Sequence, residues 1–246
     1  MKRRRNYTAL KVISVILAVV FLTIGGKYAF EMYQQNKFDK GLETVIPKIE
    51  KKSNIAKELK SVINPNPIFL GDSNSGVDNE NSLSDMIADQ NKAKEKGITK
   101  QKAGFLVIPK ISQTLPIFRG ANQYTLSLGV ATYYYDDAVM GEGNYVLAGH
   151  NMEQTGVIFS DLNQLVKGDA MDLVSDQTVF RYRVDSIKVV PQTLTFINGK
   201  PEKGSILDLP ERGERAKLTL FTCVYTSNGK ERYVVSGHLS EMFPNQ

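Results

Sequence analysis

The sequence has no tryptophan, only two histidines and a single cysteine, Cys223. One thiol cannot form an intrachain disulfide, so a disulfide framework is excluded. If the protein is exported, an unpaired thiol is an accident, an intermolecular link or a reactive group. With only His150 and His238 present, the imidazole candidates for a general base can be listed completely. The remaining composition, 41% hydrophobic and 23% charged, is typical of a globular protein.

The C-terminal part of the chain lacks any excess of positive charge. The formal net charge of +5 arises in residues 1–100, with 17 Lys and Arg against 11 Asp and Glu, whereas residues 101–246 have 14 against 15. Five cations crowd the first eleven residues: Lys2, Arg3, Arg4, Arg5 and Lys11. A domain without a basic surplus has no general attraction for phosphate, so nucleic acid is not the expected partner.

Behind the basic tip, residues 12–26 form a run of fifteen residues without a charge. With its apolar neighbours up to residue 30, the run reaches the roughly 20 residues that a membrane-spanning helix needs. A cleaved signal peptide is the rival interpretation, but the run is not followed by a convincing small-x-small cleavage site. We therefore expect a transmembrane anchor over 12–30, a cytoplasmic tip over 1–11 and the rest of the chain outside the cell.

After the anchor, the sequence pattern changes near residue 101. Residues 31–100 resemble a stem, with a linker rich in Asp, Asn, Ser and Gly over 71–84 and a short helix over 84–96. Residues 101–246 contain short β-like runs, and 159–166 suggest one short helix. Eight strands with little helix predict a mainly β fold, a closed or nearly closed barrel. The expected strands are 104–108, 115–118, 130–135, 144–148, 170–174, 179–190, 217–222 and 232–239.

Three residues with side chains that suit acyl transfer lie at the ends of predicted strands. Cys223 ends the strand 217–223, His150 follows the run 144–149, and Arg232 begins the last strand. A thiolate can attack a carbonyl, an imidazolium can protonate the leaving amine, and a cation can stabilise the oxyanion. Each residue also has a plain interpretation, as a buried inert thiol, a structural histidine or a solvated charge. His238 lies six residues beyond Arg232, about 20 Å along a strand, and cannot share a site with it.

The motifs around these residues resemble the sortase family, most closely class A. Thr219-Leu-Phe-Thr-Cys223 fits the TLxTC signature around the sortase nucleophile, and Arg232 follows it. Asn144-Tyr-Val-Leu-Ala-Gly-His150 is similar to the strand that ends in the family's active-site histidine. Weaker matches in the expected order extend the resemblance over residues 104–239: 106–110, 115–118, 129–130, 159–162 and 168–169.

The resemblance implies an eight-stranded sortase-type barrel that cleaves an LPxTG-like signal between Thr and Gly. Cys223 would form a thioacyl-enzyme, with His150 as acid and base and Arg232 as the cation. Thr222 and Ala148 would contact substrate. The implied partners are LPxTG-bearing surface proteins and an amine of lipid II or of a peptidoglycan cross-bridge.

Several alternatives remain open. The acceptor could be a protein lysine, as in pilin-polymerising sortases, or the domain could be a non-catalytic membrane-tethered β-domain. No cofactor is required. A calcium site would need acidic residues 136, 137 and 142 to meet 202, 208 or 211. We favour a solvated acidic face, because carboxylate spacing alone does not define a calcium site. The segment 192–216 is expected to flank the substrate groove.

Overall fold

The computed structural model describes residues 2–47, 55–71, 82–152 and 154–245. These residues form two compact units, one ending at Lys40 and one beginning at Gly41. Most of the helix α1 (Lys2–Glu43) makes up the first unit. Its part Leu10–Glu43 is long and apolar enough to cross a membrane, and the most apolar stretch is not buried. An apolar helix exposed all round is what a membrane anchor requires.

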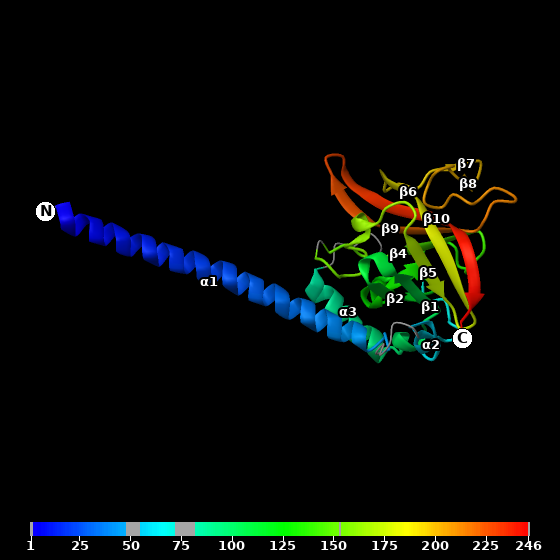
Figure 1. Ribbon diagram of the computed structural model, residues 1–246, viewed down its shortest axis with the longest axis horizontal. Helices are drawn as coiled ribbons and strands as arrows, with labels where there is room; N and C mark the ends of the chain where they lie inside the picture. The colour runs from blue at the N-terminus through cyan, green and yellow to red at the C-terminus, as the bar shows by residue number, and fades with distance from the viewer. Residues whose placement is uncertain (1, 48–54, 72–81, 153, 246) are drawn as a thin grey trace. The chain divides into compact units, whose positions relative to one another are not determined.

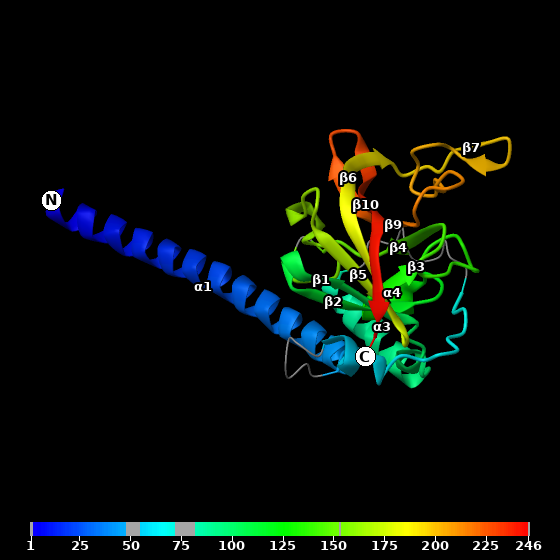
Figure 2. The ribbon, with the colours of Figure 1, turned by 45° about the vertical axis from the view of Figure 1, so that its right-hand side comes forward.

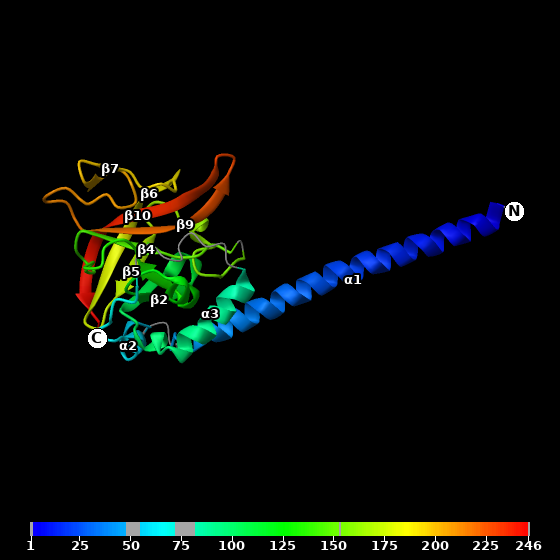
Figure 3. The same ribbon diagram turned by 180° about the vertical axis from the view of Figure 1, so that it is seen from behind.

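The second unit contains a closed barrel of eight strands in the order β1-β2-β3-β4-β9-β10-β6-β5 (Figures 1 and 3). Neighbouring strands are antiparallel except β2–β3 and β4–β9, which are parallel. The predicted mainly β fold and the eight-stranded barrel are confirmed. The strands are β1 (Gly104–Ile108), β2 (Gln113–Phe118), β3 (Val130–Thr132), β4 (Asn144–Ala148), β5 (Ala170–Val174), β6 (Thr178–Pro191), β9 (Lys217–Thr226) and β10 (Gly229–Pro244).

Apolar side chains that point inward from every strand fill the barrel. Strands β3 and β4 are buried at every position, so both of their faces are covered. The long strands β6 and β10 run side by side (Figure 2). Their ladder shifts register at Ser236/Gly237 and Leu239/Glu241, and such bulges bend a strand so that it can follow a barrel wall. Fully buried core residues include Phe105, Leu106, Ile117, Leu147, Leu220 and Val235.

Short helices cover one end of the barrel. Leu59 of α2 (Ile55–Lys60) packs with three buried side chains of β1, β5 and β6. The helix α3 (Leu83–Glu95) starts at a capping box of Ser82 and Asp85 and donates a hydrogen bond from Gln90 to the Ser127 carbonyl of α4 (Gln123–Leu128). Both α2 and α3 lie in the predicted stem, so described parts of it contact the barrel. The four-part division of the chain stays a prediction, and most of the expected linker 71–84 lies outside the described residues.

Three local features differ from the sequence-based expectation. The strand predicted over 130–135 ends at Thr132, because Tyr134 adopts a left-handed φ of 72° that a strand cannot contain. Residues 159–166 contain only a 3-10 turn, Leu162–Gln164. The helix α4 and the hairpin of β7 (Phe196–Ile197) and β8 (Lys200–Pro201) were not predicted.

Candidate active site

Cys223 and Arg232 face each other across the β9–β10 hairpin. The ladder pairs Arg232 directly with Cys223 and continues to the pair Thr226↔Gly229. The prediction that Cys223 ends its strand is therefore wrong, and so is the prediction that Arg232 begins the next. A two-residue turn, Ser227-Asn228, closes the hairpin tightly enough for pairing to continue beyond the cysteine.

The side chains of this pair are in contact. An Nη1 hydrogen of Arg232 is donated to Sγ of Cys223 at 2.7 Å. Only 2% of Arg232 is exposed, and its guanidinium lies 5.4 Å from the ring centre of Phe221. Cys223 itself is half-buried, so the sulfur is held in a fixed position without being closed off from a ligand. A guanidinium in this position favours negative charge on the sulfur and on an oxyanion formed beside it.

His150 is brought to the same place by the parallel pairing of β4 with β9. The register aligns Ala148 with Phe221, and the next backbone nitrogen, that of Gly149, donates to the Phe221 carbonyl at 3.2 Å. Thr222 Oγ1 donates to the Gly149 carbonyl at 2.6 Å. On the other side of His150, Asn151 Nδ2 donates to the Cys223 carbonyl at 3.3 Å. Both neighbours of His150 are thus hydrogen-bonded to the segment 222–223.

The residue before His150 must be small. A Cβ at Gly149 would lie 2.6 Å from Cδ2 of Phe159 and 2.9 Å from Cγ2 of Ile158. The Phe159 amide also donates to the His150 carbonyl at 3.0 Å. The glycine therefore allows the chain to pass close to the 158–159 segment, which fixes the backbone of the histidine.

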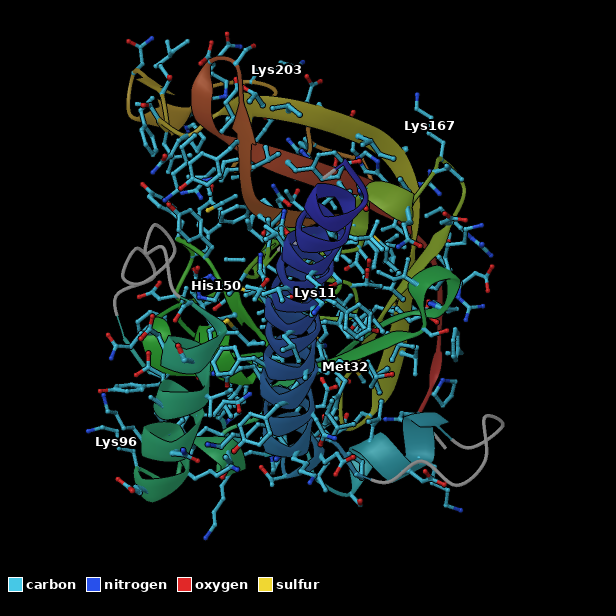
Figure 4. The ribbon with its side chains drawn as sticks, turned by 90° about the vertical axis from the view of Figure 1, so that its left-hand side faces the viewer. Lys11, Met32, Lys96, His150, Lys167 and Lys203 are labelled. Atoms are coloured by element: carbon cyan, nitrogen blue, oxygen red, sulfur yellow. The ribbon has the colours of Figure 1, made fainter. Side chains whose placement is uncertain are left out.

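The imidazole of His150 is buried and uncharged at neutral pH. It is 7% exposed, and within the described part of the chain its Nε2 has no hydrogen-bond partner. Burial, and secondarily the positive charge of Lys230, lower its pKa from 6.5 to about 4. Figure 4 shows His150 with the β9–β10 hairpin above it in that view. A neutral imidazole with an unoccupied nitrogen can accept a proton and pass it on.

The arrangement agrees with the comparison with known proteins. A sortase domain model matches residues 106–240. The chain belongs to the sortase family. It is 36% identical over 140 residues to Sortase A of Bacillus anthracis. The matched stretch covers 57% of this chain and 60% of that protein. It is 34% identical over 154 residues to Sortase D of Bacillus subtilis, strain 168. This second match covers 60% of this chain and 69% of the relative.

A solved structure of Listeria monocytogenes sortase A is also similar, at 28% identity with a TM-score of 0.49, over 58% of this chain and 90% of that one. The chain spans about three fifths of the length of the curated Bacillus anthracis relative. Sortases are transpeptidases that anchor surface proteins. In this sortase, Cys223 lies on β9, Arg232 lies on β10 and His150 lies just after the end of β4.

Thr222 and Ala148, the predicted substrate-binding residues, are both buried in the sortase domain. Thr222 is 3% exposed and its hydroxyl holds the backbone before His150. Ala148 is 1% exposed and pairs with Ala131 and Phe221. Their contact with substrate stays a prediction. Sequence reasoning missed Asn151, although a polar residue next to the candidate histidine was a signal for it.

The second histidine and the acidic residues lie away from Cys223. His238 pairs with Lys217 at the start of β9, and its Nδ1 lies 2.5 Å from Asp185. The Glu211 carboxylate forms an ion pair with Lys203, and Asp208 accepts a hydrogen bond from the Gly204 amide at 2.8 Å. Among the described residues, no group of three or more His, Cys, Asp or Glu side chains is placed to hold a metal ion.

Proposed function

We propose that this sortase cleaves an LPxTG-like signal between Thr and Gly and transfers the acyl part to an amine of a cell-wall precursor. The observation that supports this best is the contact of the Arg232 guanidinium with Cys223 Sγ, beside a buried imidazole whose Nε2 is unpartnered within the described structure. A nucleophile, a proton carrier and an oxyanion donor are the groups that acyl transfer requires.

In the first half of the reaction, Cys223 attacks the carbonyl carbon of the signal's threonine. Arg232 stabilises the negative charge on the tetrahedral oxygen. The carbon–nitrogen bond to glycine then breaks, and His150 donates a proton to the departing amine. Because burial keeps His150 mostly neutral, the pair reacts from a minor population in which the thiol proton has moved to the imidazole.

In the second half, the amine of the cell-wall precursor attacks the thioester. Neutral His150 takes the proton that this amine loses, the carbon–sulfur bond breaks, and Cys223 leaves as a thiolate. A new amide bond joins the surface protein to the precursor. Nothing is oxidised or reduced, and the enzyme returns to its initial state.

The proposed location is the outer face of the cell membrane. The helix α1 would cross the bilayer once, with Lys2, Arg3, Arg4 and Arg5 on the cytoplasmic side. The catalytic unit would then meet both lipid-linked precursors and exported proteins.

Mass spectrometry of products tests the proposal. The full chain in detergent is mixed with an LPxTG peptide and with candidate amines that include a cell-wall precursor amine and a lysine peptide. The proposal predicts cleavage after Thr, a product joined to the precursor amine, and neither product with Cys223→Ala. A product joined only to the lysine peptide would favour a pilin-type acceptor. Unchanged turnover by Cys223→Ala would exclude Cys223 as the nucleophile.

A further inference from the structure

Three consecutive tyrosines follow β3, and none of them enters the proposed chemistry. The chain leaves the strand in a tight turn: Tyr134 has a φ of 72°, and the Tyr135 amide donates to the Tyr133 carbonyl at 3.0 Å. A left-handed backbone is unusual for so bulky a residue and persists only where the surroundings fix it. The turn sends the three side chains to three different partners.

The two outer tyrosines join the catalytic region to the connection 192–216. Tyr133 meets Phe221 edge to face with the ring centres 4.9 Å apart, and Phe221 lies under the Arg232 guanidinium. Tyr135 donates its hydroxyl to the Leu207 carbonyl at 3.0 Å. The backbone on both sides of Tyr134 is therefore held in place.

The middle tyrosine contacts the first part of that connection. The ring of Tyr134 packs against the ring of Phe196 in β7, with centres 5.6 Å apart and planes inclined at 33°. The ring of Tyr135 lies nearly perpendicular to that of Tyr134, at 5.2 Å. Tyr134 is 36% exposed and Phe196 is 40% exposed. Because this pair lies at the surface, its rings can separate without unfolding of the barrel.

The segment that leads to Phe196 forms one wall of an open groove. Residues 191–194, Tyr133 and the β9–β10 hairpin line this groove, whose volume is about 830 Å³. Pro191, at the start of the wall, pairs with Glu231 in the β6–β10 ladder. Phe196, at its end, packs on Tyr134. Without the ring contact, the wall would lose the support that follows it along the chain.

We propose that Tyr134 is a positioning residue for the sorting signal, which holds the wall 191–196 in place before the peptide binds. This inference rests on the proposed transpeptidase function. A wall that is ordered in advance removes the entropy cost of ordering it on binding. Loss of the ring contact should therefore raise KM and change kcat little, because Cys223, His150 and Arg232 keep their places. One aromatic pair limits the rise in KM to about three- to tenfold.

A double-mutant cycle on the two rings of the full-length enzyme tests the proposal. Tyr134→Gly removes one ring and supplies a residue that adopts a positive φ without strain, and Phe196→Ala removes the other ring. Each should raise KM for an LPxTG peptide about three- to tenfold, with kcat little changed. The double variant should have the KM of the single variants, because both changes remove the same contact.

Two further variants are controls. Tyr134→Phe keeps the ring and should keep the wild-type KM. Ser112→Gly relieves a left-handed φ of 53° at an exposed residue that does not line the groove, and it should also behave like wild type.

Hydrogen exchange provides a readout that does not depend on turnover. The amides of residues 192–197 should exchange faster in Tyr134→Gly and in Phe196→Ala than in wild type or in either control. Unchanged exchange in this segment, or rises in KM that multiply in the double variant, would overturn the inference. Failure of wild type to cleave any LPxTG peptide would instead contradict the proposed function, and faster exchange would then confine the role of Tyr134 to ordering the wall.

Discussion

Arg232 reaches the sulfur of Cys223 from the directly opposing position of the neighbouring strand. Its planar fork is held by burial and by the face of Phe221. A lysine at this position would keep the charge but lose both the fork and the stacking. The position of the charge, as well as its sign, should therefore determine the rate.

Replacing Arg232 with lysine should lower kcat for an LPxTG peptide by about 100-fold or more, because an oxyanion donor is displaced. KM should change much less, since the interaction strengthens in the transition state. Arg183→Lys is the control, as Arg183 is exposed on β6 and donates to the Gly168 carbonyl. Steady-state kinetics of both variants make the comparison. A wild-type kcat for Arg232→Lys would show that the guanidinium is not needed.

His150 links the catalytic site to stability at acidic pH. Its pKa is about 4 in the folded protein against 6.5 ordinarily, because burial disfavours the imidazolium. As the pH falls below 6.5, the unfolded chain binds a proton that the folded chain does not bind until about pH 4. This group therefore contributes stability above pH 6.5 that is lost as the pH falls to 4, about 3 kcal/mol in all.

Urea unfolding at pH 7 and at pH 4.5 measures this loss. Wild type should lose more stability between these values than His150→Gln, by roughly 2 kcal/mol. His238→Gln retains His150 and should show a loss close to that of wild type. Equal losses in wild type and His150→Gln would mean that the imidazole is not buried in its neutral form.

At the scale of elements, the connection between β6 and β9, residues 192–216, is hydrogen-bonded to the barrel mainly over residues 204–209. Asn144 Nδ2 donates to the carbonyls of Ile206 and Asp208 at 3.0 and 2.8 Å, while its Oδ1 accepts from Thr219 Oγ1 at 2.8 Å. Tyr135 donates its hydroxyl to the Leu207 carbonyl at 3.0 Å. Asn144, the first residue of β4, and Tyr135, which precedes that strand, thus hold the middle of the connection that the sequence predicts to flank the groove.

Asn144→Ala should destabilise the protein by about 2–4 kcal/mol, because it removes three hydrogen bonds and leaves the buried Thr219 hydroxyl unpaired. Hydrogen exchange should also become faster across residues 204–209. Asn163→Ala, at an exposed position of a 3-10 turn, is expected to change stability by less than about 0.5 kcal/mol. If Asn144→Ala also lowered the stability by less than about 0.5 kcal/mol, the proposed role of these hydrogen bonds would be contradicted.

Strand positions could be predicted because alternation and turn residues are local signals. The bounds 104–108, 144–148 and 170–174 are those of β1, β4 and β5. The extension of β9 to Thr226 could not be predicted, since it depends on pairing with β10 across a tight turn. The short helix α4 was also missed, although its cap, Asn122 with Thr125, was visible. The candidate site was named from motifs, but the backbone position of His150 depends on the close approach of Gly149 to 158–159 and on the Phe159 amide, which no local pattern encodes.

At the scale of the whole molecule, the apolar stretch of α1 is the feature that supports the proposed membrane location. Leu10, Val15, Leu17 and Phe21 are all more than 60% exposed in the isolated helix. Exposed apolar side chains in such a continuous stretch are consistent with a helix that lies in a bilayer. The basic tip favours one orientation of the anchor.

Protease treatment of intact protoplasts tests this orientation. The catalytic unit should be digested from outside, and the protein should stay with the membrane in alkaline carbonate. Replacing Lys2, Arg3, Arg4 and Arg5 with glutamate should reduce the accessible fraction, because the charge bias that orients the helix is removed. Val19→Leu is the control and should behave like wild type. A wild-type catalytic unit that is protected until the cells are lysed would contradict the proposed topology.

Acid-quenched intact-mass analysis, followed by peptide mapping, tests the central claim most directly. Full-length enzyme is mixed with an excess of an LPxTG peptide and quenched during turnover. The account predicts a mass increase equal to the LPxT acyl group, located on Cys223 and removed by adding the acceptor amine. Cleavage of the peptide without this adduct, or an adduct on any other residue, would contradict the account.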